Sequence, residues 1–488
     1  MLVRCPRMSG CRLMQGPAAP PGMDETAPAI GKDVLDATDA FVSDWVSEDR
    51  IPGATLSVFD PEGTTASAFG ARQLRENEPA TPDTLLGIGS CTKSFTGIAI
   101  LQLAEEGKLA VDDPVNEHID AYRDASGDPV TIRELLSHSS GLPSDGMATA
   151  LISRMMGLEP MEVPLSGAED FHRHVAGALE DRATHHDEPF FYYNSGFTML
   201  GEIIEERSGQ SYADYVEARI LEPLGMERST FAEEAFEDDD DTMTPYYKED
   251  GSATPGSFPF DESIHAPGGM LSSVRELARY GRMHLNGGEL DGERILSADR
   301  IEEARTPVSQ REQLVDGTPQ EYAYGWMVRE FLGDTLVCHG GGIGVYNAFV
   351  GYLRDAELGV AVQCTTTPET HPMYAGPAVL ALLQGESPEA TVPHLALKRA
   401  LPELTGEYAS YRGIMELSVD RMGGGLALRA ETERAGGLEL PLIPTDLGGD
   451  DWVFTTVEAN GAEVPVRFER TENAVDLYYQ RWRLHKQD

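Results

Sequence analysis

The sequence predicts an α+β fold made of an antiparallel sheet flanked by helices, a mostly helical region, and a small C-terminal antiparallel β-barrel. Three observations lead to this prediction. Short apolar strands occur early in the chain and again beyond residue 334. The long stretch between Ser90 and about His284 carries helical patterns, and from Leu404 onward apolar and polar residues alternate.

The sheet is expected to combine strands from two distant parts of the chain. A helix is expected first, over residues 33–48. A hairpin follows, with its two strands separated by the turn Asp60-Pro61-Glu62-Gly63. Strands are expected over residues 54–59, 65–69, 335–338, 345–350 and 359–364.

A central buried helix is expected to begin near Ser90. A short apolar strand ends in glycines just before Ser90, and the run that follows is hydrophobic on nearly all sides. Gly107 suits the C-terminal cap of this helix. Residues three apart share a helix face, so Ser90 and Lys93 are expected to touch.

A second domain is expected after a change of composition at residues 387–402. Beyond it, Met415, Leu417 and Val419 alternate with polar residues, and glycine pairs punctuate the sequence as hairpin turns. This pattern predicts a small antiparallel barrel. The expected domains are a disordered extension at 1–22, a first domain at 23–390, a linker at 391–402 and the barrel at 403–488.

The charge balance restricts the partners of the protein. There are 82 acidic and 38 basic residues, a net charge of −44, and only six lysines. An acidic surface of this kind keeps proteins dissolved in concentrated salt, which predicts a halophilic source. It also repels nucleic acid and anionic membranes, so neither is an expected partner.

Cysteine usage and the N-terminus bear on location. The five cysteines form no C-x-x-C motif, the first 22 residues hold no continuous apolar stretch typical of a signal peptide, and no apolar run approaches the length of a membrane helix. A cytoplasmic protein with free thiols is expected.

Two features look like metal sites, but no metal is expected. The acidic run 233–241 lacks the ligand spacing of a calcium loop and is expected to be a solvated loop. The pair His185-His186, followed by Asp187 and Glu188, consists of neighbours that point apart on a loop. No cofactor is expected either.

Three polar motifs, each at the boundary of an element, are hard to explain by packing. The first is Ser90-Cys91-Thr92-Lys93, at the head of the buried helix. The second is Tyr192-Tyr193-Asn194, before an amphipathic helix. The third is His339-Gly340-Gly341-Gly342, between two apolar strands.

With these motifs in this order, the chain resembles the penicillin-recognising serine hydrolases, and within them the class C β-lactamase branch with its esterases, D-aminopeptidases and D,D-peptidases. That superfamily carries S-x-x-K, Y-x-N, and K-T-G or H-x-G. The resemblance covers roughly residues 33–384 and includes the phrases at 130–142 and 266–273. It implies a β-lactamase/transpeptidase-like fold, and the C-terminal part resembles the lipocalin-like modules of some of these hydrolases.

The resemblance and the chemistry of the residues together assign roles. Ser90 is the expected nucleophile, and Lys93 with Tyr192 forms the expected base and acid pair. Which of the two takes the serine proton stays open. Asn194 is expected to orient Lys93 and to hold a substrate amide.

The third motif is expected to stabilise the oxyanion and bind the substrate. The backbone N–H groups of Ser90 and Gly342 are the expected oxyanion donors. Gly341 and its neighbours let a substrate strand approach closely. His339 replaces the lysine of K-T-G, and a largely neutral imidazole holds a carboxylate weakly. His138, by contrast, is expected to be a satisfied turn residue.

These roles predict a serine hydrolase that acts through an acyl-enzyme on a small peptide, amide or ester, as a peptidase, D-aminopeptidase or esterase. The alternatives are a β-lactamase or D,D-carboxypeptidase, which His339 disfavours, and a non-catalytic ligand-binding or acyl-sensor protein. The C-terminal barrel is expected to be a lid or an assembly surface, and a homo-oligomer through it is possible.

Overall fold

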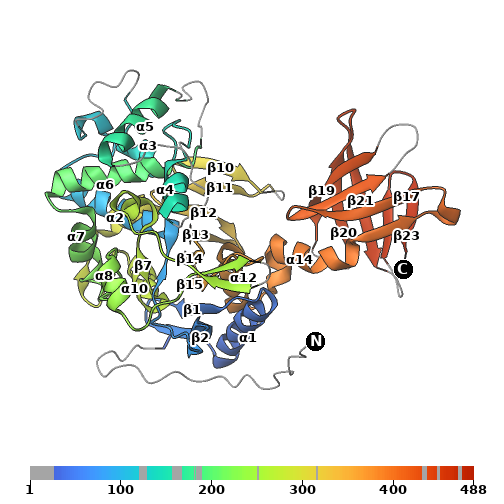
Figure 1. The fold of residues 1–488 in the computed structure, drawn as a ribbon, viewed down its shortest axis with the longest axis horizontal. Helices are drawn as coiled ribbons and strands as arrows, with labels where there is room; N and C mark the ends of the chain where they lie inside the picture. Colours follow the sequence, from blue (N-terminus) through green and yellow to red (C-terminus); the bar gives the residue numbers. More distant parts are fainter. Residues whose placement is uncertain are drawn as a thin grey trace.

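A computed structural model describes residues 27–119, 129–144, 146–155, 167–180, 182, 190–249, 252–314, 317–430, 437–447, 451–470 and 475–487. It contains a large body of helices around a sheet, and a separate β-barrel at one end of the long axis (Figure 1). The expected residues 1–22 and the His185-His186 pair lie outside the described residues. The α+β prediction is confirmed.

The sheet has nine antiparallel strands in the order β10-β11-β12-β13-β14-β15-β1-β2-β3. Strand β1 lies between β2 and β15, with Ala54 opposite Cys364, so the two distant parts of the chain do join in one sheet. All seven residues of β1 are buried, as a central strand requires. The strands are β1 (Gly53–Phe59), β2 (Thr64–Gln73), β3 (Glu78–Pro79), β10 (Ser309–Gln313), β11 (Pro319–Tyr322), β12 (Met327–Phe331), β13 (Asp334–Ile343), β14 (Tyr346–Leu353) and β15 (Leu358–Thr365).

Four of these strands, β3 and β10 to β12, were not predicted. Strand β10 has the sequence Ser-Gln-Arg-Glu-Gln and is mostly exposed, so it has no alternation of apolar and polar residues to reveal it. Strand β13 is also longer than expected. It continues through the His-Gly-Gly-Gly motif to Ile343, because β14 pairs with it over that whole length.

Helix α2 (Thr92–Glu105) is the central buried helix. Every residue from Thr92 to Leu103 is buried, and the short 3-10 turn η1 (Gly89–Cys91) precedes it. Glu106 is the C-cap of α2, and Gly107 follows it with a φ of 71°, a left-handed conformation that favours glycine. The prediction for this helix is confirmed.

Most of the remaining helices lie around α2 or against the sheet, whereas α14 leads to the barrel. Helices α1 and α12 share one apolar cluster with the sheet through Val42, Trp45, Val379 and Leu380, while α10 packs with α2 in another. The helices are α1 (Lys32–Glu48), α3 (Ile132–Leu136), α4 (Met147–Met155), α5 (Ala168–Glu180), α6 (Asn194–Ser208), α7 (Tyr212–Val216), α8 (Glu233–Asp238), α9 (His265–Gly268), α10 (Val274–Leu285), α11 (Ala298–Arg305), α12 (Pro372–Leu383), α13 (Pro388–Thr391) and α14 (Pro393–Leu404).

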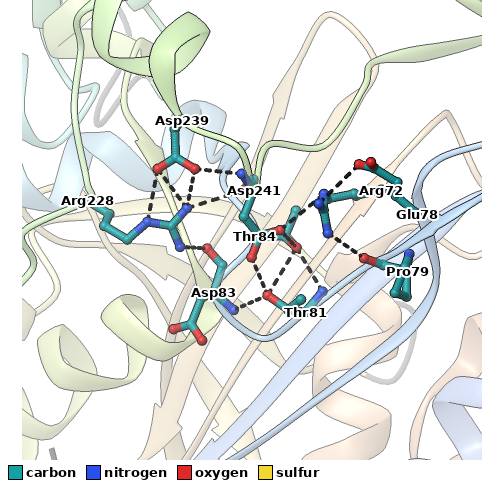
Figure 2. A network of polar contacts seen from close by, with 9 residues as sticks. All are labelled: Arg72, Glu78, Pro79, Thr81, Asp83, Thr84, Arg228, Asp239 and Asp241. Carbon is teal, nitrogen blue, oxygen red and sulfur yellow. Dashed lines mark hydrogen bonds and ion pairs between the residues drawn. The ribbon is translucent and has the colours of Figure 1, made fainter. Parts of the chain in front are cut away.

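The acidic run 233–241 is only partly the solvated loop that the sequence predicted. Its first part is the exposed helix α8. Its last part is tied to the body: Asp239 accepts from the Arg228 guanidinium at 2.6 Å, and Asp241 accepts from the hydroxyl of Thr84 at 2.6 Å (Figure 2). Arg72 joins the same network at 3.6 Å from Asp241. Partners outside the run explain the difference: Arg228 lies just before it in the sequence, whereas Arg72 and Thr84 are far away.

The C-terminal strands close into an eight-stranded barrel, as predicted. The last strand pairs back onto the first, with Tyr408 opposite Lys486. Helix α14 lies between the body and the barrel, and its residues Leu401 and Leu404 belong to the barrel core (Figure 1). The strands are β16 (Gly406–Ala409), β17 (Glu416–Met422), β18 (Gly425–Ala430), β19 (Leu438–Asp446), β20 (Asp451–Val457), β21 (Glu463–Arg470), β22 (Val475–Tyr479) and β23 (Trp482–Lys486).

Within the described ranges, no helix is both long enough and apolar enough to cross a bilayer. In the same ranges, no three His, Cys, Asp or Glu side chains gather as metal ligands would. Cys91, Cys338 and Cys364 are buried free thiols.

Candidate active site

Ser90 and Lys93 meet at the start of α2. Ser90 lies in η1 and is half-buried, whereas Lys93 occupies the first turn of α2 and is completely buried. The Lys93 Nζ atom donates to Ser90 Oγ at 3.0 Å. The i, i+3 spacing therefore brings an amine into contact with an accessible hydroxyl.

The surroundings of Lys93 favour its neutral form. Nζ also donates to Asn194 Oδ1 at 2.8 Å and to the Pro267 carbonyl at 2.7 Å. All three acceptors are uncharged, so among the described residues no carboxylate in contact compensates the ammonium. Burial lowers the Lys93 pKa from 10.5 to about 7.

Tyr192 is the third residue of the site and contacts both Lys93 and Ser90. Its ring centroid lies 4.9 Å from Lys93 Nζ, and its side chain is hydrogen-bonded to that of Ser90. Removal from water raises the Tyr192 pKa above its ordinary value of 10, and the Ser90 hydrogen bond only partly offsets this. The phenol therefore keeps its proton at neutral pH.

Asn194 is the first residue of α6, a helix whose apolar side, including Met199 and Ile203, is buried as the sequence predicted. This placement sets the Asn194 amide against Lys93. Sequence positions 90, 93, 192 and 194 thus converge on one site.

Strand β13 runs directly beside Ser90. A Cβ atom on Gly341 would lie 1.8 Å from the Ile88 carbonyl oxygen and 3.1 Å from the Ser90 nitrogen. Gly89 has a φ of 52°, and a Cβ there would lie 2.5 Å from the Gly342 nitrogen. Glycines at both positions let the strand and the turn before α2 approach backbone to backbone.

Strand register indicates where the Gly342 N–H points. Strand β12 pairs with β13 only as far as Cys338, so beyond that residue the edge is open, with no described strand paired to it. Two-residue turns at 332–333 and 344–345 flank β13, and residues that flank such turns exchange hydrogen bonds with each other. Backbone groups of successive strand residues point to alternate sides. Counting from either turn, those of Gly341 point toward β14 and those of Gly342 point toward the open edge. Gly342 is exposed there.

His339 is held inside the protein. Its Nδ1 lies 2.6 Å from the Gly340 carbonyl, which can only accept, so Nδ1 carries the proton. Nε2 then accepts from the Tyr322 hydroxyl at 2.9 Å. Burial, with a smaller contribution from the Lys93 charge, lowers the His339 pKa to about 3. The ring is neutral, in agreement with the sequence argument.

Two residues near the site were missed by sequence reasoning. Tyr322 contacts His339, and Arg311 places its guanidinium 5.3 Å from the Phe190 ring centroid. The Arg311 charge further lowers the His339 pKa. Both residues come from β10 and β11, the strands that the hydrophobic pattern did not reveal.

A cavity of about 450 Å³ lies along α6. Its lining includes Ser195 and Ala266, which follow Asn194 and precede Pro267 in sequence, but not Ser90 or Lys93. Four carboxylates line it: Glu202, Glu205, Asp261 and Glu262. A cavity with this lining is unfavourable for an anionic group.

Comparisons with known protein families agree with this geometry. Residues 35–384 match the model of the Beta-lactamase family, which is more than half of the chain. Residues 388–485 match the Pab87 octamerisation domain.

Individual relatives extend over most of the chain. The octameric penicillin-binding protein homologue from Pyrococcus abyssi is 36% identical, with a TM-score of 0.82 over 93% of this chain and 100% of that one. Protein flp of Staphylococcus aureus is 26% identical over 68% of this chain and 64% of its own length, so the chain spans less than two thirds of that relative.

A third relative supports the fold alone. The D-amino acid amidase from Ochrobactrum anthropi SV3 is 21% identical, with a TM-score of 0.58 over 72% of this chain and 99% of that one. The three motifs, the sheet beside α2 and the family match over residues 35–384 lead to one conclusion: the chain belongs to the beta-lactamase family.

Proposed function

We propose that this protein is a serine hydrolase that forms an acyl-enzyme on Ser90 and cleaves amide, peptide or ester bonds. One observation carries the proposal: a completely buried amine, with a pKa lowered to about 7, donates to the Ser90 hydroxyl at 3.0 Å. An unassisted serine is a poor nucleophile, and an adjacent base with a pKa near the working pH activates it most effectively.

In the proposed acylation, neutral Lys93 accepts the Ser90 proton as Oγ attacks the substrate carbonyl. Tyr192 keeps its own proton at neutral pH and donates it to the leaving amine or alkoxide, then recovers a proton from Lys93. In deacylation, water attacks the acyl carbon while its proton passes through Tyr192 to neutral Lys93, and Lys93 then returns a proton to Ser90 Oγ as the acyl bond breaks. The raised pKa of Tyr192 supports this division of roles over one in which a tyrosinate starts the reaction.

The N–H groups of Ser90 and Gly342 are the proposed oxyanion donors. The register that turns Gly342 toward the open edge of β13, and its closeness to the turn before α2, support this assignment. Fixed donors of this kind stabilise the tetrahedral intermediate by about 2.7–4 kcal/mol each. Gly341, which has no side chain, lets β13 lie close enough to Ser90 for both donors to reach one oxyanion.

Amides are the favoured substrates within this class. The amidase from Ochrobactrum anthropi shares the fold, and the contact of the Asn194 side chain with Lys93 supports the proposal that its amide holds a substrate amide. A β-lactamase is the less favoured alternative. A buried, neutral His339 that already binds Tyr322 offers no positive charge for a β-lactam carboxylate.

Labelling with a fluorophosphonate probe tests the nucleophile. We expect wild-type protein to be labelled and Ser90→Ala to be unlabelled. Ser94→Ala is the matched control, because the Ser94 hydroxyl lies one turn further along α2 and donates to the Cys91 carbonyl at 2.9 Å. Equal labelling of Ser90→Ala would refute the proposal. Turnover of D-amino acid amides and p-nitrophenyl esters separates an enzyme from a ligand-binding protein, and nitrocefin tests the β-lactamase alternative.

We also propose that the chain assembles with copies of itself through the barrel. The match to an octamerisation domain and the octameric homologue support this. Of the ten exposed large hydrophobic residues in the described ranges, six lie in the barrel part of the chain: Tyr411, Ile414, Met422, Leu438, Ile443 and Val457. Contiguous exposed apolar patches mark interaction sites, so these six residues are the proposed candidates for the interface.

Light scattering tests the assembly. We expect wild-type protein to be oligomeric and the double variant Ile443→Asp, Val457→Asp to be smaller. Leu74→Asp, equally exposed but on the first domain, is the control and should leave the mass unchanged. A monomeric wild-type protein would contradict the proposal.

A further inference from the structure

The segment that carries Tyr192 is held from both sides by one residue, His138. The Phe191 N–H donates to the His138 carbonyl at 3.0 Å, and the Tyr193 N–H donates to His138 Nδ1 at 3.1 Å. These two donors flank Tyr192 in the chain. Hydrogen bonds on both neighbours leave the backbone of Tyr192 little freedom to rotate.

The His138 ring also packs against Tyr192 directly. Their centroids are 4.3 Å apart, and the same imidazole lies 5.1 Å from Phe197 and 4.8 Å from Tyr322. The imidazole therefore belongs to the cluster of aromatic rings that packs against the Tyr192 phenol. Backbone and side chain of Tyr192 are both positioned by the same residue.

The turn that carries His138 is itself firmly held. The Ser309 hydroxyl donates to the Ser137 carbonyl at 2.6 Å, and the Ser139 N–H donates to the Glu134 carbonyl at 2.9 Å. Helix α3 before the turn begins with a reciprocal capping box between Thr131 and Glu134. The two hydrogen bonds that His138 accepts from the Tyr192 segment are therefore held in place through α3 and β10.

His138 differs from the satisfied turn residue that the sequence predicted. Because Nδ1 accepts the hydrogen bond of the Tyr193 N–H, the ring proton is on Nε2, which is buried and has no hydrogen-bond partner among the described residues. Its φ is 55°, a left-handed conformation that is unfavourable for a non-glycine residue. Burial, the charges of Lys93 and Arg311, and nearby His339 hold the His138 pKa well below its usual value, so the ring stays neutral.

An unpaired buried N–H and a left-handed backbone both cost stability, and such costs concentrate where a functional geometry is maintained. We propose that His138 is a positioning residue, whose Nδ1 and carbonyl fix the Tyr192 phenol against Ser90. This inference rests on the proposed function of Tyr192 as the proton donor. His138 itself touches no substrate atom in this role.

Two variants separate the effect of the Nδ1 acceptor from the effect of the aromatic ring. His138→Asn keeps an acceptor near the position of Nδ1 and tolerates a positive φ, whereas His138→Phe keeps the ring and removes the acceptor. We expect His138→Phe to lower kcat for a D-amino acid amide by about 100-fold with little change in KM, since small misplacements of a catalytic group cost that much. His138→Asn should restore most of kcat.

A double-mutant cycle with Tyr192→Phe gives the decisive readout. If His138 acts through the phenol, His138→Phe should cause little further loss in a Tyr192→Phe background. Independent, multiplying losses would overturn the inference, as would wild-type kcat in His138→Phe. Circular dichroism checks folding, and an unfolded His138→Asn would also overturn it, because His138 would then be needed for the fold.

The failure of this inference is distinguishable from the failure of the proposed function. Labelling that survives Ser90→Ala refutes the proposed function. Labelling lost in Ser90→Ala, together with losses that multiply in the cycle, leaves the proposed function standing and removes only the role of His138.

Discussion

Lys93 Nζ lies 2.8 Å from Asn194 Oδ1, an acceptor 101 residues further along the chain, and this contact joins the first two polar motifs into one site. The acceptor is an amide rather than a carboxylate. This difference matters because a neutral acceptor leaves the lysine pKa low, whereas a carboxylate would raise it.

The first prediction concerns pH. Because the Lys93 pKa is lowered to about 7 and the base must be neutral, kcat/KM should rise as pH increases through about 7 and then level off. Initial rates on an amide substrate between pH 5 and 9 measure this. A profile that is flat across this range would contradict Lys93 as the proton acceptor.

The second prediction follows from the amide at position 194. Asn194→Asp places a carboxylate beside Lys93, which should raise the lysine pKa and shift the pH–rate midpoint upward by about 1 unit or more. Activity at pH 7 should fall and partly recover at pH 9. Asn194→Leu is the control, because it removes the acceptor without adding charge and should not recover at high pH.

The third prediction concerns the close approach of β13. Gly341→Ala should sharply lower kcat, because its Cβ would lie 1.8 Å from the Ile88 carbonyl and must push β13 away from the turn that carries Ser90. The strain should also cost about 1–3 kcal/mol of stability. Gly424→Ala in the barrel has open space around its Cβ and should change neither kcat nor stability. Wild-type kcat in Gly341→Ala would contradict the placement.

The fourth prediction concerns acid stability. His284 is completely buried, has no hydrogen-bond partner among the described residues for either ring nitrogen, and has a pKa lowered by burial from 6.5 to about 3. The unfolded chain therefore binds a proton more readily, and stability is lost as pH falls below about 6.5.

His284→Leu removes this term, so its free energy of unfolding relative to wild type should rise by about 2 kcal/mol between pH 7.5 and pH 5. Urea unfolding at the two pH values measures the difference. An unchanged difference between variant and wild type would exclude His284 as a source of acid sensitivity.

The fifth prediction concerns salt. A net charge of −44 makes self-repulsion large, and added ions screen it. The melting temperature should therefore rise from 0.1 M to molar KCl by many degrees. A melting temperature that is unchanged or lower in molar KCl would argue against adaptation to high salt.

Much of the fold was predictable because its core elements carry strong local patterns. The apolar residues of β1 and the continuous hydrophobic run of α2 indicate burial, and regular alternation indicates the barrel strands. Strands β10 and β11 escaped prediction because their exposed polar residues, such as Gln310 and Glu312, resemble a loop. Most of the linker expected at 391–402 is helix α14, which begins at Pro393 and whose packing on the barrel depends on contacts that no local pattern reveals.

The sequence by itself determined which groups the site contains, since the spacing of Ser90 and Lys93 on a helix and the glycines beside His339 follow from local geometry. Only the tertiary structure decided what those groups can do. Burial and partners far away in sequence set the Lys93 pKa, keep the His339 ring neutral and hold Tyr192 through the hydrogen bonds to His138. Desolvation and long-range hydrogen bonds arise when the chain is packed, so no local stretch of residues encodes them.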